Sequence, residues 1–376
     1  MIGQRNNFSC RNFIRISAGA ALALGGALSL SCQAAVNGDG STAVQAFQLP
    51  VSALRSAASL QAPLKASYNS DFGEILKQKN CHEGADKDLA AQKKAEACML
   101  GVYYKAKIYT DLASRYKAAI ENSVIAGVQV AVVTPVGGIA PENKARVLID
   151  LHGGTMKWGA VHELVMNAVP MAAVGRVKVI SIDYAKAPAH RFPAASKDVA
   201  AVYRELLKTY KPENIGLYGC AIPSLVGGAM AWFVEEGLPL PGAAAMLCGG
   251  AGPLDGDSMH IISAVDGHDY AAIFQNAFTG PGAYFEQAGM ASPLVRPGMS
   301  GEVMKQFPPT LLAGGSRGFL LSSALHTHRQ LIRLGVEASL HVWEGMESGF
   351  HQEPLRPETR QLHKVLAKFF NKHLAR

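Results

Sequence analysis

The chain has 376 residues, 49% of them hydrophobic, and a formal net charge of +7. This length suits one large α/β domain or two smaller ones with a substantial core. The positive charge is mild for this size. No basic stripe interleaved with aromatic residues occurs, which argues against a nucleic-acid-binding protein.

An export signal is predicted over residues 1–35. Its first 15 residues contain three arginines, and an apolar run of 15 residues follows, Ile16 to Leu30. This run is shorter than the roughly 20 residues that a bilayer span needs, so it suits a signal better than a membrane anchor. We expect no transmembrane segment once the signal is removed. Cys10 stands where a twin-arginine signal has its first arginine, which leaves the export route open. We expect a periplasmic or secreted protein, with lipid anchoring at Cys32 as the less favoured alternative.

Four cysteines remain beyond the predicted signal. Cys81 and Cys98 flank a charged segment and could form a disulfide in an oxidising compartment. Cys220 and Cys248 each follow a short apolar run that is typical of a buried strand. This position predicts buried free thiols for both.

The chain divides into three predicted regions: the signal at 1–35, an N-terminal arm with a helical cap region at 36–124, and an α/β domain at 125–376. Residues 36–60 have little periodicity, whereas the charges and apolar residues of 72–122 have helical spacing. We expect this helical region to lie over a pocket.

From residue 125 onwards, apolar strands alternate with helices. Strands are predicted at Val128–Val133, Val147–Leu151, Val177–Ile182, Ile215–Tyr218, Ala243–Leu247, Thr310–Leu312 and Ser339–Trp343, and helices at His162–Val174, Ala195–Thr209, Ser224–Glu236, Ser322–Leu334 and Pro357–Lys372. The alternation predicts an α/β fold, with a mostly parallel sheet covered by helices on both faces. Residues 251–306, rich in Gly, Pro and Asp, predict an insertion of loops and helices near the carboxyl ends of the strands, where such sheets bind ligands.

A sharp turn, Gly219-Cys220-Ala221-Ile222-Pro223, follows the predicted strand Ile215–Tyr218 and leads into a helix of small residues. Strand, turn and helix are the context of the nucleophile elbow G-x-S-x-G of α/β hydrolases. Here Ala221 occupies the apex, and Pro223 replaces the second glycine. An alanine methyl group cannot attack a carbonyl.

Five segments in chain order carry a family resemblance. They are His152-Gly153-Gly154-Thr155, Asp183-Tyr184-Ala185-Lys186-Ala187-Pro188, the elbow, Gly315-Ser316-Arg317-Gly318, and Gly345-Met346-Glu347-Ser348-Gly349-Phe350. Over about residues 125–376 the chain resembles the hormone-sensitive-lipase-like carboxylesterases, a branch of the α/β hydrolases. The resemblance implies an α/β-hydrolase fold with a helical N-terminal cap region.

In that family an H-G-G-G loop supplies backbone N–H groups to the oxyanion hole. Gly153 and Gly154 match this role, and Thr155 replaces the last glycine. A glycine pair lets the backbone approach a ligand closely. The resemblance therefore implies a ligand-binding surface, formed by His152, Gly153, Gly154, Thr155, Tyr184 and Ile222.

The resemblance also places the catalytic serine, aspartate and histidine at Ala221, Gly318 and Ser348, so none of the triad is intact. The serine needs a base that takes its proton and a carboxylate that orients the base. Loss of the serine or the histidine alone typically costs about 10⁶ in turnover. Three losses at three separate motifs predict a pseudoenzyme. The residues indicate neither a cofactor nor a metal site.

Three functions stay open. The leading one is a non-catalytic protein that binds a small apolar or acyl ligand in the former ester pocket, as the plant gibberellin receptors of the same family bind a hormone. The alternative is a secreted carboxylesterase-like hydrolase, or a lyase or cyclase, with a rewired site that could use Ser224 or Cys220. The third is an interaction protein whose domain presents the helical N-terminal region. The sequence leaves the oligomeric state open.

Overall fold

The computed structural model describes residues 35–36, 42–43, 81, 89–105, 110, 112, 114–157, 159, 162–220, 225–266, 269–353 and 356–375. The chain forms two units, residues 1–47 and 48–376. In the first, strands β1 (Ala35–Val36) and β2 (Thr42–Ala43) pair antiparallel. The rest of the predicted signal, with Cys32, lies outside the described residues. No helix in the described ranges has the length and apolar character needed to cross a bilayer.

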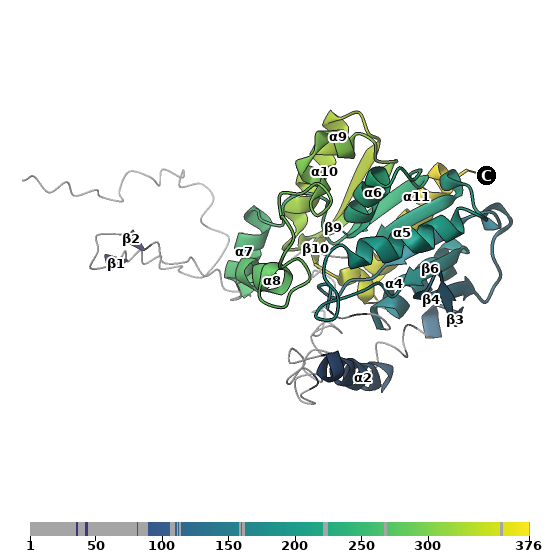
Figure 1. Ribbon diagram of the computed structural model, residues 1–376, viewed down its shortest axis with the longest axis horizontal. Helices are drawn as coiled ribbons and strands as arrows, with labels where there is room; N and C mark the ends of the chain where they lie inside the picture. Colours follow the sequence, from purple (N-terminus) through teal and green to yellow (C-terminus); the bar gives the residue numbers. More distant parts are fainter. Residues whose placement is uncertain are drawn as a thin grey trace, which may run out of the picture. The chain divides into compact units, whose positions relative to one another are not determined.

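The second unit is built on an eight-stranded sheet (Figure 1). Its strand order is β10-β9-β8-β7-β5-β6-β4-β3. Strand β4 runs antiparallel to both of its neighbours, and the other pairs are parallel. The bounds are β3 Ala118–Ile125, β4 Val128–Pro135, β5 Val147–Leu151, β6 Lys178–Ile182, β7 Ile215–Gly219, β8 Ala243–Leu247, β9 Thr310–Arg317 and β10 Ala338–Glu347. The predicted α/β-hydrolase architecture is confirmed.

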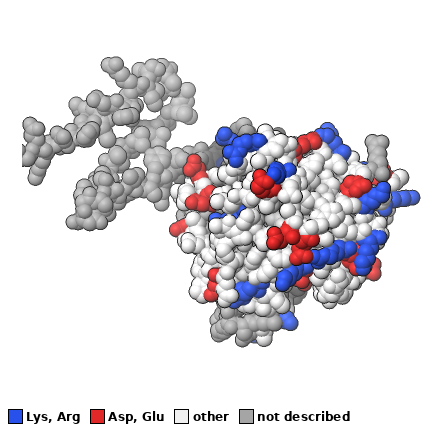
Figure 2. All heavy atoms as spheres, turned by 45° about the horizontal axis from the view of Figure 1, so that its top comes forward, with Lys and Arg blue, Asp and Glu red and all other residues white. Residues whose placement is uncertain are grey.

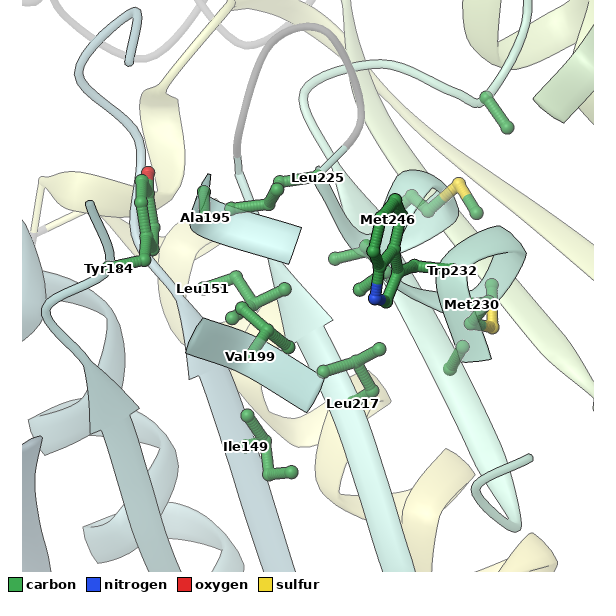
Figure 3. Packing of buried hydrophobic residues seen from close by; sticks show 14 of the residues in the cluster. Ile149, Leu151, Tyr184, Ala195, Val199, Leu217, Leu225, Met230, Trp232 and Met246 are labelled. Carbon is green, nitrogen blue, oxygen red and sulfur yellow. The ribbon is translucent and has the colours of Figure 1, made fainter. Parts of the chain in front are cut away.

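Helices cover both faces of the sheet because successive strand residues point to opposite sides. Ile149 of β5 joins a core cluster with helices α5 (Ala194–Leu206), α6 (Leu225–Glu235) and α10 (Leu321–Arg333). Its neighbour Leu148 joins a second cluster with α4 (His162–Gly175) and α11 (Pro357–His373). Figure 3 shows the first cluster, in which Leu151 and Leu217 of the strands lie beside Val199 of α5.

The central strands are buried along their whole length, which is why they could be predicted. All five residues of β5, β7 and β8 are buried. A strand covered on both faces is a continuous apolar run, and the predicted limits of β5 and β8 match the structure. Gly335, with φ of 77°, follows α10 as a left-handed helix cap.

The edge strand β3 corrects the predicted helical region, which was expected to extend to residue 122. Residues from Ala118 onwards pair with β4 in full register. The two strands are joined at Ala126 and Gly127, whose φ angles of 50° and 83° suit a tight hairpin turn. The side chains of Ile120 and Val124 are exposed. The strand therefore lacks the apolar pattern of the central strands, and the Ala-Gly turn is its clearest signal.

Further helices belong to the insertion between β8 and β9 and to the N-terminal region. The predicted insertion at 251–306 is confirmed and contains α7 (Asp257–Asp266), α8 (Tyr270–Thr279) and α9 (Gly301–Met304), between β8 and β9. The N-terminal region contains α2 (Leu89–Lys105). A disulfide joins Cys81 to Cys98 of this helix. On the face drawn in Figure 2, acidic and basic side chains are interspersed over the surface.

Candidate functional site

The turn that the sequence identifies as the elbow follows β7. Ala221 and Ile222 lie outside the described residues, as do 223 and 224, so their predicted roles stay predictions. The last strand residue, Gly219, pairs with Leu151 of β5. A Cβ atom on Gly219 would lie 2.1 Å from the Leu151 carbonyl oxygen, so only glycine allows this approach. The structure thus explains the first glycine of the elbow.

The acid and base positions of the resemblance, Gly318 and Ser348, lie side by side. Each directly follows a strand, β9 and β10, and these strands are parallel neighbours. A Cβ atom on Gly318 would lie 3.2 Å from Ser348 Oγ. Two motifs 30 positions apart in the sequence therefore meet at one point, as an acid–base pair would require.

The space between these two positions is small. A cavity of about 10 Å³ is lined by Gly318, Ser348, His351 and Cys248, among others. This volume is close to the minimum for one water molecule. Ser348 Oγ is buried, and no described residue hydrogen-bonds to it. An acyl group does not fit in a cavity of this volume.

His351 is the imidazole at this cavity. It is buried, and its Nδ1 lies 3.9 Å from Cys248 Sγ. Burial lowers the pKa of His351 to about 4. Burial and the charge of His351 lower the pKa of the nearby His363 to about 3. Both imidazoles are therefore neutral at pH 7, and His351 is a weak base for abstracting a proton from a serine.

These two buried histidines give the protein a predicted sensitivity to acid. In the unfolded chain each has a pKa near 6.5. As the pH falls from about 6.5 towards 4, the unfolded state takes up protons that the folded state does not. The free energy of unfolding should therefore fall by up to about 1.4 kcal/mol per pH unit for each histidine, and it should be fully recovered above pH 7.

Urea denaturation at pH 7, 6 and 5 measures this slope. The variants H351Q and H363Q should each remove the contribution of one histidine, and H326Q on the exposed side of α10 serves as the control. Equal slopes in all four proteins would contradict the prediction.

The Tyr184 side chain supports the glycine loop, which consists of residues 152–155. The rings of His152 and Tyr184 stack at 4.3 Å, and the Tyr184 hydroxyl donates to the His152 carbonyl oxygen at 2.6 Å. Gly154 has φ of 98° and Thr155 has φ of 53°. The Thr155 hydroxyl donates to the Gly154 carbonyl oxygen at 2.8 Å. The side chains of His152 and Tyr184 are buried, so the structure places them as supports of the loop. Their predicted part in binding stays a prediction.

The expectation of free thiols at Cys220 and Cys248 is wrong, because the two form a disulfide. Strands β7 and β8 are parallel neighbours, with Gly219 opposite Met246. The residues that follow the two strands therefore come close at the same end of the sheet, with their Cα atoms 5.4 Å apart. Strand adjacency together with an oxidising compartment would have indicated this bond. The disulfide also removes Cys220 as a candidate nucleophile while it is intact.

A buried ion-pair network, which was not predicted from the sequence, holds the segment that carries Ser348. Arg356 precedes α11 and is 7% exposed. Its Nη2 lies 2.9 Å from a Glu347 carboxylate oxygen, and its Nε pairs with the Glu353 carboxylate at 2.5 Å. Because the two carboxylates flank Ser348 and His351 in sequence, the guanidinium fixes both ends of this segment. In the sequence these charges look like solvated surface residues.

Comparisons with known proteins place this geometry in a family. Residues 148–352 match the family described as alpha/beta hydrolase fold. An acetyl-hydrolase of Streptomyces hygroscopicus is 27% identical over 236 residues, which cover 60% of this chain and 75% of that protein. The crystal structure of the esterase E25 is 30% identical, with a TM-score of 0.64 over 74% of this chain and 87% of that one.

A crystal structure of an esterase from the bacterial hormone-sensitive lipase family has a TM-score of 0.67 at 22% identity, over 83% of this chain and 100% of that one. The family match spans more than half of the chain and contains all five segments that carry the resemblance. The chain therefore belongs to the α/β-hydrolase fold family, in the branch of the hormone-sensitive-lipase-like carboxylesterases.

Proposed function

We propose that this protein is an exported, non-catalytic member of the family that binds a small apolar or acyl ligand. The observation that carries the proposal is the meeting of Gly318 and Ser348 at the ends of β9 and β10. The backbone still brings the acid and base positions together, but a glycine has no carboxylate and a serine does not accept a proton at neutral pH.

The surroundings of these positions supply no replacement among the residues that the structure describes. His351 is the imidazole at the cavity, and its pKa of about 4 makes it a weak base near pH 7. The side chain of Glu353 is buried and pairs with Arg356, so it is not available to orient an imidazole beside Ser348. Both positions therefore support the proposal that the protein is non-catalytic.

The conformation of the glycine loop favours a ligand-binding role for this region over the absence of any role. Tyr184 still holds the His152 carbonyl group, and Gly154 and Thr155 keep left-handed backbone angles. A loop without function gains nothing from this arrangement, because left-handed angles are unfavourable for threonine. Since the cavity beside Gly318 is too small for an acyl group, the ligand would lie towards residues 152–155.

Export is part of the proposal. The features that support it are the basic and apolar pattern of residues 1–35 and the two disulfides, Cys81–Cys98 and Cys220–Cys248. Disulfides form and persist in oxidising compartments such as the bacterial periplasm.

An ester hydrolase with a rewired site is the second candidate, favoured by the relatives, which are named as an acetyl-hydrolase and esterases. Hydrolysis of p-nitrophenyl acetate, butyrate and octanoate by the purified oxidised protein separates the two. We expect rates equal to those of buffer, and no labelling by a fluorophosphonate probe.

The control for that assay is the variant S224A, which removes the serine nearest the elbow in sequence. Turnover well above the buffer rate that disappears in S224A would overturn the non-catalytic proposal. Turnover that appears only after reduction of the Cys220–Cys248 disulfide, and is lost again on alkylation of the thiols, would also overturn it, through a different nucleophile.

A further inference from the structure

The insertion between β8 and β9 contains a groove of about 380 Å³. Its apolar lining includes Met259 of α7, Phe274 and Phe278 of α8, and Met290. This volume lies in the range of small-molecule sites, which are typically apolar with a few placed polar groups. The groove shares no lining residue with the glycine loop, so a ligand in it is independent of the proposed function.

Arg296 brings a cation to this groove. It lines the groove, and its Nε is buried without a hydrogen-bond partner among the described residues. Burial lowers the pKa of Arg296, while Asp255 raises it; a guanidinium nevertheless remains charged at neutral pH. The positive charge of Arg296 at the groove is one that an anionic ligand would complement.

Asp255 is the acidic side chain at the same groove, and it is occupied. Its carboxylate lies 2.8 Å from Nε2 of His260, at a rim where both side chains are more than half exposed. The Asp255 side chain is 79% exposed, and Arg296 lines the same groove as the apolar side chains. Cation and apolar wall together match a molecule with a carboxylate head and an aliphatic tail.

We propose that this groove binds the anion of a medium-chain fatty acid, with its carboxylate on Arg296 and its chain along Phe274, Phe278 and Met259. A guanidinium binds a carboxylate through two parallel hydrogen bonds. Methionine and phenylalanine side chains adapt to a flexible chain by packing. The ligand would thus be recognised by the charge of its carboxylate and by the length of its aliphatic chain.

Phe274 also links the groove to the domain. It packs against Phe319 at 5.0 Å between ring centroids, and Tyr270 stacks on the same ring at 4.7 Å. Phe319 directly follows Gly318. An acid bound in the groove would therefore contact a side chain that packs against the end of β9.

Titration calorimetry of the full oxidised protein with hexanoate, octanoate and decanoate tests the proposal. Affinity should rise about fourfold with each added methylene until the groove is filled. Decanol, which has the chain without the charge, should bind at least about tenfold more weakly than decanoate. The ester-hydrolysis rate is not part of this readout, so the two proposals can fail independently.

Variants locate the site. R296Q should weaken decanoate binding at least about tenfold and leave decanol binding unchanged, and R333Q on the exposed side of α10 should have no effect. If R296Q fails to fold, A271E adds a repelling carboxylate at the groove without touching Arg296, and it should weaken decanoate binding in the same way. Equal affinities for decanol and decanoate, decanoate binding unaffected by both R296Q and A271E, or no binding of any acid at millimolar concentration would each overturn the proposal.

Discussion

The triple variant A221S/G318D/S348H is expected to hydrolyse p-nitrophenyl acetate at least about a hundredfold faster than the parent chain, which should match the buffer rate. The strands that carry two of the three positions are already in place. A Cβ on Gly318 would lie 3.0 Å from the Gly315 carbonyl oxygen and 3.2 Å from Ser348 Oγ, so the neighbouring atoms would have to move by a few tenths of an ångström. Gly154 and Thr155 have left-handed backbone angles, and the restored serine would rely on backbone N–H groups of this loop to stabilise the oxyanion.

The partial variants are the controls, since a triad acts as a unit. A221S alone has no base, and G318D/S348H has no nucleophile, so both should remain at the buffer rate. Melting temperatures of all three variants show whether each is folded. A folded triple variant with no activity would mean that the turn at 220–224 or the glycine loop has lost its catalytic geometry as well.

The variant R356M is expected to lower the free energy of unfolding by about 3–5 kcal/mol, because it removes the arginine cation from the buried Glu353 carboxylate. Glu353 is 3% exposed and pairs with Arg356, which also hydrogen-bonds to Glu347 at 3.0 Å. Removing one partner of a buried ion pair costs far more than removing an exposed charge. Urea denaturation at pH 7 measures the difference.

Two comparisons make the Arg356 prediction specific. R360M removes an exposed arginine one turn further along α11, and it should change the free energy of unfolding by less than about 0.5 kcal/mol. The double variant E353M/R356M should recover part of the loss, since it leaves one buried charge fewer unpaired. A loss of less than about 1 kcal/mol in R356M would show that the network is solvated.

The central strands can be predicted from the sequence because a strand that is buried on both faces is a continuous run of apolar residues. Val147–Leu151 and Ala243–Leu247 are continuous apolar runs, and they are strands in full. At the sheet edge this signal is weak: in β3 the apolar residues Ile120 and Val124 are exposed and are separated by three polar residues. The helices that cover the sheet were placed to within a few residues, since each has an apolar face.

The candidate site could be predicted as far as local motifs reach. Gly318 and Ser348 were placed by their motifs, and the structure brings them together. Contacts that depend on tertiary packing could not be predicted in the same way. The stacking of Tyr184 on His152, the disulfide between the ends of β7 and β8, and the burial of Arg356 each need knowledge of which elements are neighbours.

Because of the Cys220–Cys248 disulfide, the covalent structure of the protein depends on the compartment in which it is produced. The bond directly precedes Ala221 in sequence and links the ends of two neighbouring strands. Synthesis in a reducing cytosol gives the dithiol, and synthesis with export gives the cross-linked form. A sample handled with a thiol reductant therefore differs covalently from the oxidised protein directly beside the elbow. Measurements of ligand binding or turnover describe one of these two molecules, and the redox history of the sample determines which.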